Sequence, residues 1–211
     1  MFTNSFQINL GGHDGQHFGN FPEVSRFNHD CRPNVAFYID DKLTHHTHAI
    51  RDIEPGEELT ISYLDSFRVR EVRQQRAHAS WGFACTCSQC SLSKNEADKS
   101  DARLFSIYKV ENLLADLGNR QVSPDMIEQL IELYKEERLH FKVADAYTLA
   151  ALNYNILGMT EMAQKYARLS IEQGLIEHGP DAPDIEAMRL LLANARGHWT
   201  YNRRGSREAL G

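Results

Sequence analysis

The sequence has few of the features that mark a membrane, exported or nucleic-acid-binding protein. No apolar run approaches the roughly 20 residues that a membrane-spanning helix needs, and residues 1–10 lack the basic start and the apolar core of a signal peptide. Positive charge is not in excess, because 23 Lys and Arg stand against 29 Asp and Glu in 211 residues, a formal net charge of −6. We therefore expect no membrane association and no direct binding of nucleic acid as the main function.

Cysteine is scarce, and its spacing is informative. Cys85, Cys87 and Cys90 form a Cys-x-Cys-x-x-Cys cluster, and the only other cysteine, Cys31, lies far upstream. A structural zinc site needs four ligands in a tetrahedron, and such a cluster supplies three. The spacing therefore predicts one Zn²⁺ held by all four cysteines, with four free thiols as the alternative. Disulfides are disfavoured by the tight spacing and the missing export signal, which also indicates a cytoplasmic or nuclear protein.

The first part of the chain has the patterns of strands and turns. Alternating apolar residues predict a strand over 2–10, followed by a glycine-rich turn at 11–15. Residues 34–50 are typical of a hairpin, and residues 57–63 of a further strand. Residues 66–79 are charged and predict a helix that leads toward the cysteine cluster.

Three histidines lie close together on the return strand of the predicted hairpin. Alternation puts His46 and His48 on one face of that strand and His45 on the other. The three side chains cannot then converge on one metal ion. A polar strand is the favoured interpretation.

The pattern changes to a helical period after the cysteine cluster. We expect a partial β-rich domain with its zinc cluster over 1–92, a polar linker over 93–100, a helical domain over 101–196 and a loose basic tail over 197–211. The predicted fold class is α+β. Apolar stripes indicate five helices in the helical domain, of which we expect one to end at Gly158 and the next near Gly174.

The third and fourth of these helices resemble a tetratricopeptide pair. Tyr147, Ala150 and Tyr154 precede the glycine turn, and Ala163 and Ala167 follow it, so small residues lie where the helices would cross. An ordinary helical hairpin fits the spacing equally well. Either arrangement offers a surface for a protein partner.

Three motifs together resemble the C-terminal half of a SET domain, the fold of protein-lysine methyltransferases. They are Asn-His-Asp-Cys-Arg-Pro-Asn at 28–34, Gly-Glu-Glu-Leu-Thr-Ile-Ser-Tyr at 56–63, and the cysteine cluster at 85–90. The subgroup most similar is the SET-and-MYND type and its fungal relatives, in which the first motif's cysteine is the fourth zinc ligand and a helical, tetratricopeptide-like domain follows. The resemblance covers residues 2–92 strongly and 101–178 loosely.

The resemblance implies roles for residues at the matching positions. Tyr63 would be the catalytic tyrosine at the mouth of the lysine channel. Asn28 and His29 would hold S-adenosyl-L-methionine, Asn4 would contact it further, and Phe83 would cover its adenine ring. The partner would be a protein substrate with a target lysine. Methyl transfer needs a neutral amine aligned with the methyl group, so the protein acts mainly by positioning.

The family's Gly-x-Gly cofactor loop and the first half of the domain have no counterpart here. Gly11 and Gly12 do not replace that loop, because they follow Asn4. Two hypotheses result. The chain is the C-terminal part of a longer methyltransferase, with doubtful activity alone, or it is a non-catalytic, zinc-stabilised protein-interaction module derived from a SET protein.

Overall fold

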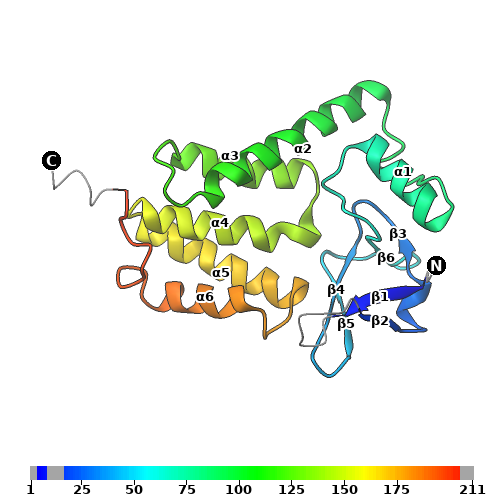
Figure 1. Ribbon diagram of the computed structural model, residues 1–211, viewed down its shortest axis with the longest axis horizontal. Coiled ribbons are helices and arrows are strands. Elements are labelled where there is room, and N and C mark those ends of the chain that lie inside the picture. The colour runs from blue at the N-terminus through cyan, green and yellow to red at the C-terminus, as the bar shows by residue number, and fades with distance from the viewer. Residues whose placement is uncertain (1–3, 9–16, 205–211) are drawn as a thin grey trace. The chain divides into compact units, whose positions relative to one another are not determined.

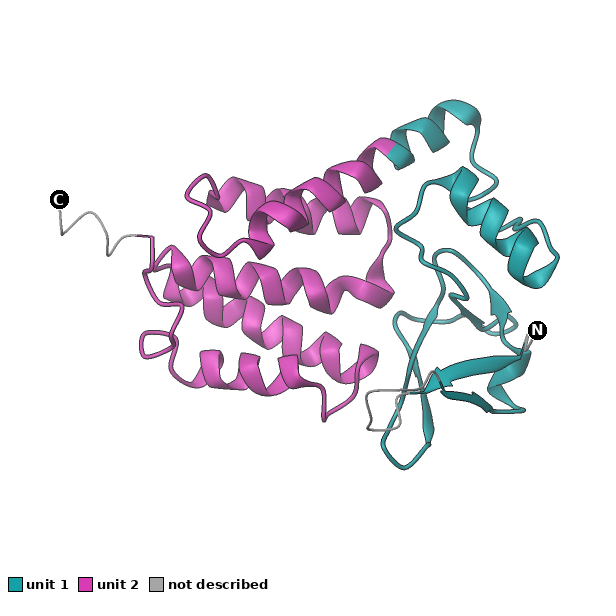
Figure 2. Ribbon diagram, viewed as in Figure 1, with its two compact units in different colours: residues 1–101 teal, residues 102–211 magenta. Residues whose placement is uncertain are grey.

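The chain forms two compact units, residues 1–101 and 102–211 (Figure 2). The computed structural model describes residues 4–8 and 17–204. All the described strands belong to the first unit, and the second unit is helical (Figure 1). The expectation of a mixed fold with a helical C-terminal region is therefore confirmed.

The first unit contains three small two-stranded sheets. Strand β1 (Ser5–Ile8) pairs antiparallel with β2 (His17–Asn20), and β4 (Val35–Ile39) pairs antiparallel with β5 (His45–Ala49). The third sheet is the parallel pair of β3 (Asn28–His29) and β6 (Thr60–Ile61). The β1 strand agrees with the predicted one where residues are described, and the turn predicted at 11–15 lies outside the described residues.

The first unit also contains a short 3₁₀ helix and an α-helix. A short 3₁₀ helix, η1 (Val24–Arg26), precedes β3, and α1 (Arg70–Trp81) leads to the cysteine cluster. Gly82 ends α1 with a φ of 77° and donates its N–H to the carbonyl of His78, 2.9 Å away. This left-handed cap is a conformation that glycine adopts without strain, and it turns the chain sharply into residues 83–90.

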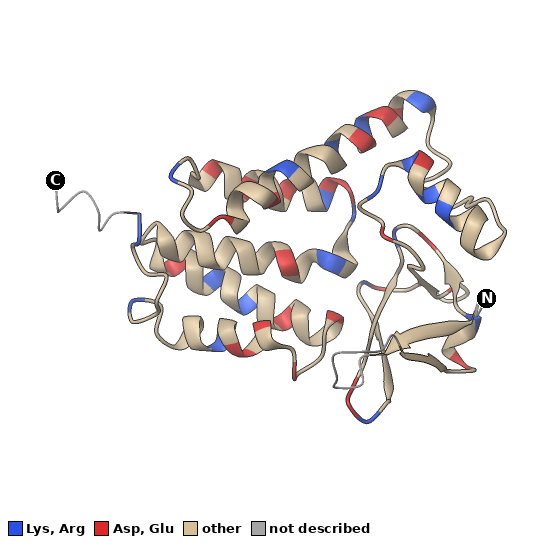
Figure 3. Ribbon diagram, viewed as in Figure 1, with Lys and Arg blue, Asp and Glu red and all other residues tan. Residues whose placement is uncertain are grey.

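The second unit is built from helices that pack on their neighbours in sequence. They are α2 (Lys94–Ala115), which begins in the first unit, α3 (Pro124–Glu136), η2 (His140–Lys142), α4 (Val143–Ile156), α5 (Thr160–Glu177) and α6 (Pro183–Ala193). Because α2 begins at Lys94, most of the stretch expected as a polar linker is helical. Acidic and basic residues are scattered over the helices of this unit (Figure 3). None of the described helices is both long and apolar enough to cross a lipid bilayer.

Two glycines in the second unit have different functions. Gly158 has a φ of 75° and ends α4 as predicted, with the N–H of Met159 donating to the carbonyl of Tyr154. Gly174 is not the last residue of its helix, which ends nearby at Glu177. It lies inside α5, where a Cβ would come within 2.7 Å of the Ile185 side chain, so its small size permits the close approach of α6.

The described part of the C-terminal tail is ordered, contrary to expectation. Thr200 is fully buried and accepts a hydrogen bond of 2.7 Å from the side chain of Asn155. The guanidinium of Arg204 donates to Asn153 Oδ1 over 3.0 Å. Residues 197–204 therefore pack on the end of α4, because its buried asparagines need polar partners.

A buried glutamate joins α5 to the start of α4. Glu177 is 1% exposed, its Oε1 accepts the N–H of Ala144 over 3.2 Å, and its Oε2 has no hydrogen-bond partner among the described residues. His178 Nε2 lies 3.8 Å from Oε2. Burial raises the pKa of Glu177 to about 7 from 4.5.

This raised pKa predicts a stability that depends on pH. The folded chain binds a proton at Glu177 that the unfolded chain has lost, so the free energy of unfolding falls as pH rises from about 4.5 through about 7. Glu177→Gln should remove this fall and stabilise the protein at pH 8 by on the order of 3 kcal/mol, with little change at pH 4.5. Urea unfolding across this pH range measures the effect. The exposed Glu172 of the same helix provides the control, Glu172→Gln, and equal behaviour of the two variants would contradict the assignment.

Candidate functional site

The parallel pairing of β3 and β6 brings the two long motifs of the sequence together. Asn28 lies opposite Thr60, and His29 lies opposite Ile61. The N–H of Asp30 donates to the carbonyl of Ile61 over 3.1 Å and extends the pairing. The predicted strand over 57–63 is thus shorter than expected, with only residues 60 and 61 in regular pairing.

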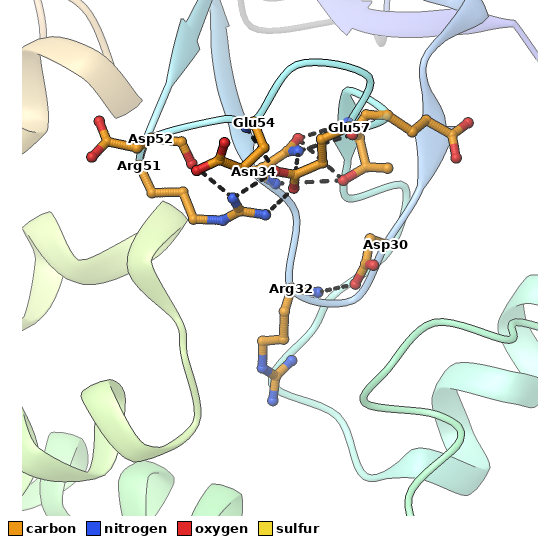
Figure 4. A network of polar contacts seen from close by, with 9 residues as sticks. Asp30, Arg32, Asn34, Arg51, Asp52, Glu54 and Glu57 are labelled. Carbon is orange, nitrogen blue, oxygen red and sulfur yellow. Dashed lines mark hydrogen bonds and ion pairs between the residues drawn. The ribbon is translucent and has the colours of Figure 1, made fainter.

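A buried asparagine replaces strand pairing on the other side of this short sheet. Asn34 is 2% exposed, and its Nδ2 donates to the carbonyl of Glu58 over 2.9 Å and to Glu57 Oε1 over 3.0 Å. Its Oδ1 accepts the N–H of Thr60 over 2.9 Å. Arg51 forms an ion pair with Glu57 at the edge of this network (Figure 4), and its hydrogen bond, the largest cause, lowers the pKa of Glu57 to about 2. One side chain therefore fixes the second motif against the first.

The loop that carries Cys31 is shaped by its neighbours. The N–H of Arg32 donates to Asp30 Oδ1 over 2.7 Å (Figure 4). The Arg32 guanidinium is buried and donates back to the carbonyl of Cys31 over 2.8 Å and to that of Ser66 over 3.3 Å. These contacts turn the Cys31 side chain inward, where it is completely buried.

All four cysteines meet in one cluster. Their Sγ atoms lie within 4.8 Å of one another, and those of Cys31 and Cys90 are 3.6 Å apart, with no disulfide among them. A tetrahedron of sulfurs around zinc has edges of about 3.8 Å. The Gln74 side chain of α1 holds both the N–H and the carbonyl of Cys85, at 3.0 and 2.7 Å, which fixes the cluster loop. The donor set and its geometry fit a tetrahedral metal site.

The thiols do not ionise equally. Hydrogen bonds with the other three cysteines lower the pKa of Cys87, whereas hydrogen bonds with Cys85, Cys87 and Cys90, together with burial, raise the pKa of Cys31. One thiolate in the cluster thus makes further deprotonation unfavourable. A divalent cation would supply the positive charge that four thiolates together require.

His29 links the cluster to the second motif. Its Nδ1 accepts the N–H of Tyr63 over 3.1 Å, so the ring's proton lies on Nε2, which faces Cys31 Sγ at 3.4 Å. Burial lowers the pKa of His29 and favours this neutral ring. The side chain predicted to hold a cofactor therefore connects a thiol to the main chain of Tyr63.

Tyr63 lies at the boundary of two cavities. Its hydroxyl donates a short hydrogen bond to the carbonyl of Phe27, and its ring lies 5.5 Å from that of Trp81. Burial, with a smaller effect of the Glu58 charge, raises the pKa of Tyr63, so the phenol keeps its proton at neutral pH. Tyr63, Asn4 and Trp81 line both cavities.

The two cavities differ in size and lining. The smaller one, of about 170 Å³, has mostly apolar walls that include Phe6, Phe27, Phe37 and Ile61. The larger one, of about 560 Å³, contains all four residues predicted to bind the cofactor: Asn4, Asn28, His29 and Phe83.

Sequence reasoning missed two residues of these cavities. Glu58 lines the larger cavity and accepts a 2.5 Å hydrogen bond from Asn28 Nδ2, and Trp81 separates the two cavities beside Tyr63. Glu58 lies within the second motif, and Trp81 comes just before the Gly-Phe that leads to the cluster. Their places in the sequence were therefore the signal that could have assigned them to the site. Neither residue type is diagnostic alone.

The three histidines of the hairpin do not converge. His45 packs among the rings of Phe6, Phe21 and Phe37, whereas His46 and His48 stack on Tyr38. The polar-strand interpretation is confirmed.

Comparisons with known proteins agree with this geometry. The SET domain family model matches residues 4–64. The chain is 29% identical over 206 residues to histone-lysine N-methyltransferase set5 of Schizosaccharomyces pombe, covering 93% of this chain and 63% of that protein. It is 32% identical over 185 residues to human histone-lysine N-methyltransferase SMYD3 and 33% identical over 194 residues to human N-lysine methyltransferase SMYD2.

Each of the two human alignments covers 82% of this chain, and 42% and 43% of the relatives respectively. The chain thus spans less than two thirds of the length of these relatives. The matched segment holds β1 to β6, Cys31 and Tyr63, and the alignments extend through the cysteine cluster into the helical unit. The chain belongs to the SET domain family, and within it to the relatives of the SET-and-MYND-type protein-lysine methyltransferases.

Proposed function

We propose that this chain is the C-terminal part of an S-adenosyl-L-methionine-dependent protein-lysine methyltransferase. The observation that carries the proposal is the position of Tyr63, whose side chain lines two adjoining cavities of different character. A transferase that moves a methyl group between two molecules needs such a pair of sites, one for each molecule, with the reacting atoms meeting between them. The names of the relatives support the same reaction.

The larger cavity would bind S-adenosyl-L-methionine, which supplies a methyl group on a positively charged sulfur. Its volume is within the usual range for a site of this kind. The carboxylates of Glu58 and Asp30 line it and suit a ligand with cationic groups. Asn4 and Asn28 offer amide groups, and Phe83, 6.0 Å from the His29 ring, offers an aromatic face.

The smaller cavity would receive the side chain of the target lysine. Its phenylalanine walls would favour the neutral amine, because desolvation lowers the pKa of an ammonium group. The Tyr63 hydroxyl donates its hydrogen bond to the Phe27 carbonyl, so the lone pairs on its oxygen can accept an N–H of the amine. That contact would direct the nitrogen lone pair toward the larger cavity.

The cysteine cluster would hold one structural zinc ion through Cys31, Cys85, Cys87 and Cys90. The support is a closed set of four sulfurs with near-tetrahedral spacing. Phe83 and Leu64 pack against the cluster. The ion would therefore stabilise the wall that carries Phe83 and would take no part in the reaction.

The helical unit would be tetratricopeptide-like and would bind a protein partner. In support, α4 and α5 pack together, with Ala150, Ala163 and Ala167 fully buried and Gly158 at the turn. The domain organisation would be a partial SET domain with its zinc cluster followed by a helical domain.

A second candidate function is a non-catalytic, zinc-stabilised interaction module. It is favoured by two aromatic side chains on α2, Phe105 and Tyr108, which are 67% and 65% exposed. Residues three apart share one face of a helix, so they form one apolar patch.

The catalytic proposal predicts that removing the hydroxyl oxygen of Tyr63 greatly slows methyl transfer. Tyr63→Phe should lower methyl transfer at least about 100-fold in the cellular protein that carries this chain, because the hydroxyl orients the amine only in the reacting arrangement. Transfer of radiolabelled methyl groups to protein measures it, and zinc content should not change. Tyr38→Phe, on β4, is the matched control. Normal activity of the Tyr63 variant would remove this residue from the mechanism.

The zinc proposal predicts one equivalent of metal per chain. Elemental analysis of protein purified without added zinc should give this value, and removal of zinc by a chelator should lower the melting temperature under reducing conditions. Cys31→Ser should lose the metal, whereas Thr86→Ala, an exposed change in the same loop, should keep it. Well under one equivalent in the native protein would refute the site.

The interaction module makes a separate prediction. The chain should fold alone and bind a protein without S-adenosyl-L-methionine, and the double change Phe105→Ser and Tyr108→Ser should abolish that binding. Cross-linking followed by mass spectrometry of the captured partner tests this, with Lys109→Ser as the control on the same helix. Aggregation of the isolated chain would count against this function.

A further inference from the structure

Arg73, on α1, is the largest side chain among the fully buried described residues. It is 1% exposed, although arginine is almost never buried without a partner. The sequence suggests an ordinary charged surface helix here, and its neighbour Arg76 is indeed exposed. The burial of one arginine beside an exposed one indicates a specific function for the first.

The Arg73 guanidinium has few uncharged hydrogen-bond partners among the described residues. It donates a short hydrogen bond to the carbonyl of Arg68, and its Nε has no hydrogen-bond partner within the described part of the chain. No carboxylate among the described residues forms an ion pair with it. A buried, unpaired guanidinium is costly, so a counter-charge is required.

That counter-charge lies in the cysteine cluster. α1 lies against the cluster, since the side chain of the next residue, Gln74, binds the N–H and the carbonyl of Cys85 at 3.0 and 2.7 Å. The buried guanidinium of Arg73 is close enough for the charges of Cys31 and Cys90 to act on it. Neutral thiols offer little to a cation, whereas thiolates offer a full charge and a good acceptor.

Four thiolates around Zn²⁺ carry a net charge of −2, enclosed here in a largely buried site. A permanent positive charge against two of the sulfurs offsets part of it. His29 Nε2–H faces Cys31 from another direction and adds a second donor to the same sulfur. Groups of this kind, outside the ligands themselves, tune metal affinity.

We propose that Arg73 is a positioning residue that compensates the charge of the zinc–tetrathiolate cluster and so sets its affinity for the metal. The inference rests on the proposed zinc site. It explains why α1 buries a cation next to the cluster, and it makes the metal and Arg73 depend on each other. Without zinc, no cation holds all four sulfurs as thiolates, so the buried guanidinium loses most of the negative charge that compensates it and destabilises the unit.

Two variants that differ in charge test the proposal on the intact chain. Arg73→Gln should weaken zinc binding about 10- to 100-fold in competition with a chromophoric chelator, the usual range for groups that support metal ligands. Arg73→Lys keeps the charge and should lose much less affinity. Arg76→Gln removes the same charge from an exposed position of α1 and should bind zinc like the native chain.

Thermal unfolding separates this effect from simple packing. With zinc bound, Arg73→Gln should melt at a lower temperature than the native chain, whereas after chelation in reducing buffer it should melt at the same or a higher temperature. The proposal would be overturned if Arg73→Gln lowered the melting temperature equally with and without zinc, or if this variant bound zinc as tightly as the native chain. If Arg73→Gln does not fold, Arg73→Lys provides the test, with Arg76→Lys as its control. A much larger loss of zinc affinity in Arg73→Lys than in Arg76→Lys would then overturn the proposal, because both variants keep the positive charge. A native chain that binds no zinc would refute the zinc site itself, which is a distinguishable result.

Discussion

The meeting of Cys31 with the Cys85–Cys90 loop is the contact on which the first unit depends. Cys31 comes two residues after His29, the last residue of β3, so its burial fixes the end of that strand. The cluster loop is fixed in turn by Gln74 of α1. Two segments that are distant in sequence therefore meet at four sulfur atoms, and α1 is fixed beside them, in a unit whose sheets are too small to be stable alone.

The geometry around Tyr63 follows from this junction. The main chain of Tyr63 is bound to the His29 ring, and its hydroxyl is bound to Phe27, which directly precedes β3. Both of these residues, His29 and Phe27, belong to the short segment that ends at Cys31. Tyr63, at the boundary between the two cavities, is thus held by Phe27 and His29.

The sequence predicts those features that depend on spacing. The gathering of Cys31 with the distant cluster, the opposite faces of His45 and His46, and the helix end at Gly158 follow from ligand number, strand period and backbone freedom. The extent of β6 was overestimated, because the side chain of Asn34 takes the hydrogen bonds that a strand partner would otherwise make. The position of Gly174 at a helix crossing was not predicted, since a glycine at a crossing and one near a helix end look alike in sequence. The burial of Arg73 depends on tertiary contacts that no local pattern contains.

The hydrogen bonds of His29 also affect how experiments on this protein are to be interpreted. One ring joins Cys31, a thiol of the cluster, to the main chain of Tyr63. Any disturbance of the sulfur would pass through a single rigid imidazole to the residue between the cavities. An enzyme built in this way would be inhibited by chelating agents and by thiol reagents, and would resemble a metalloenzyme in such assays, although its metal touches no reacting atom.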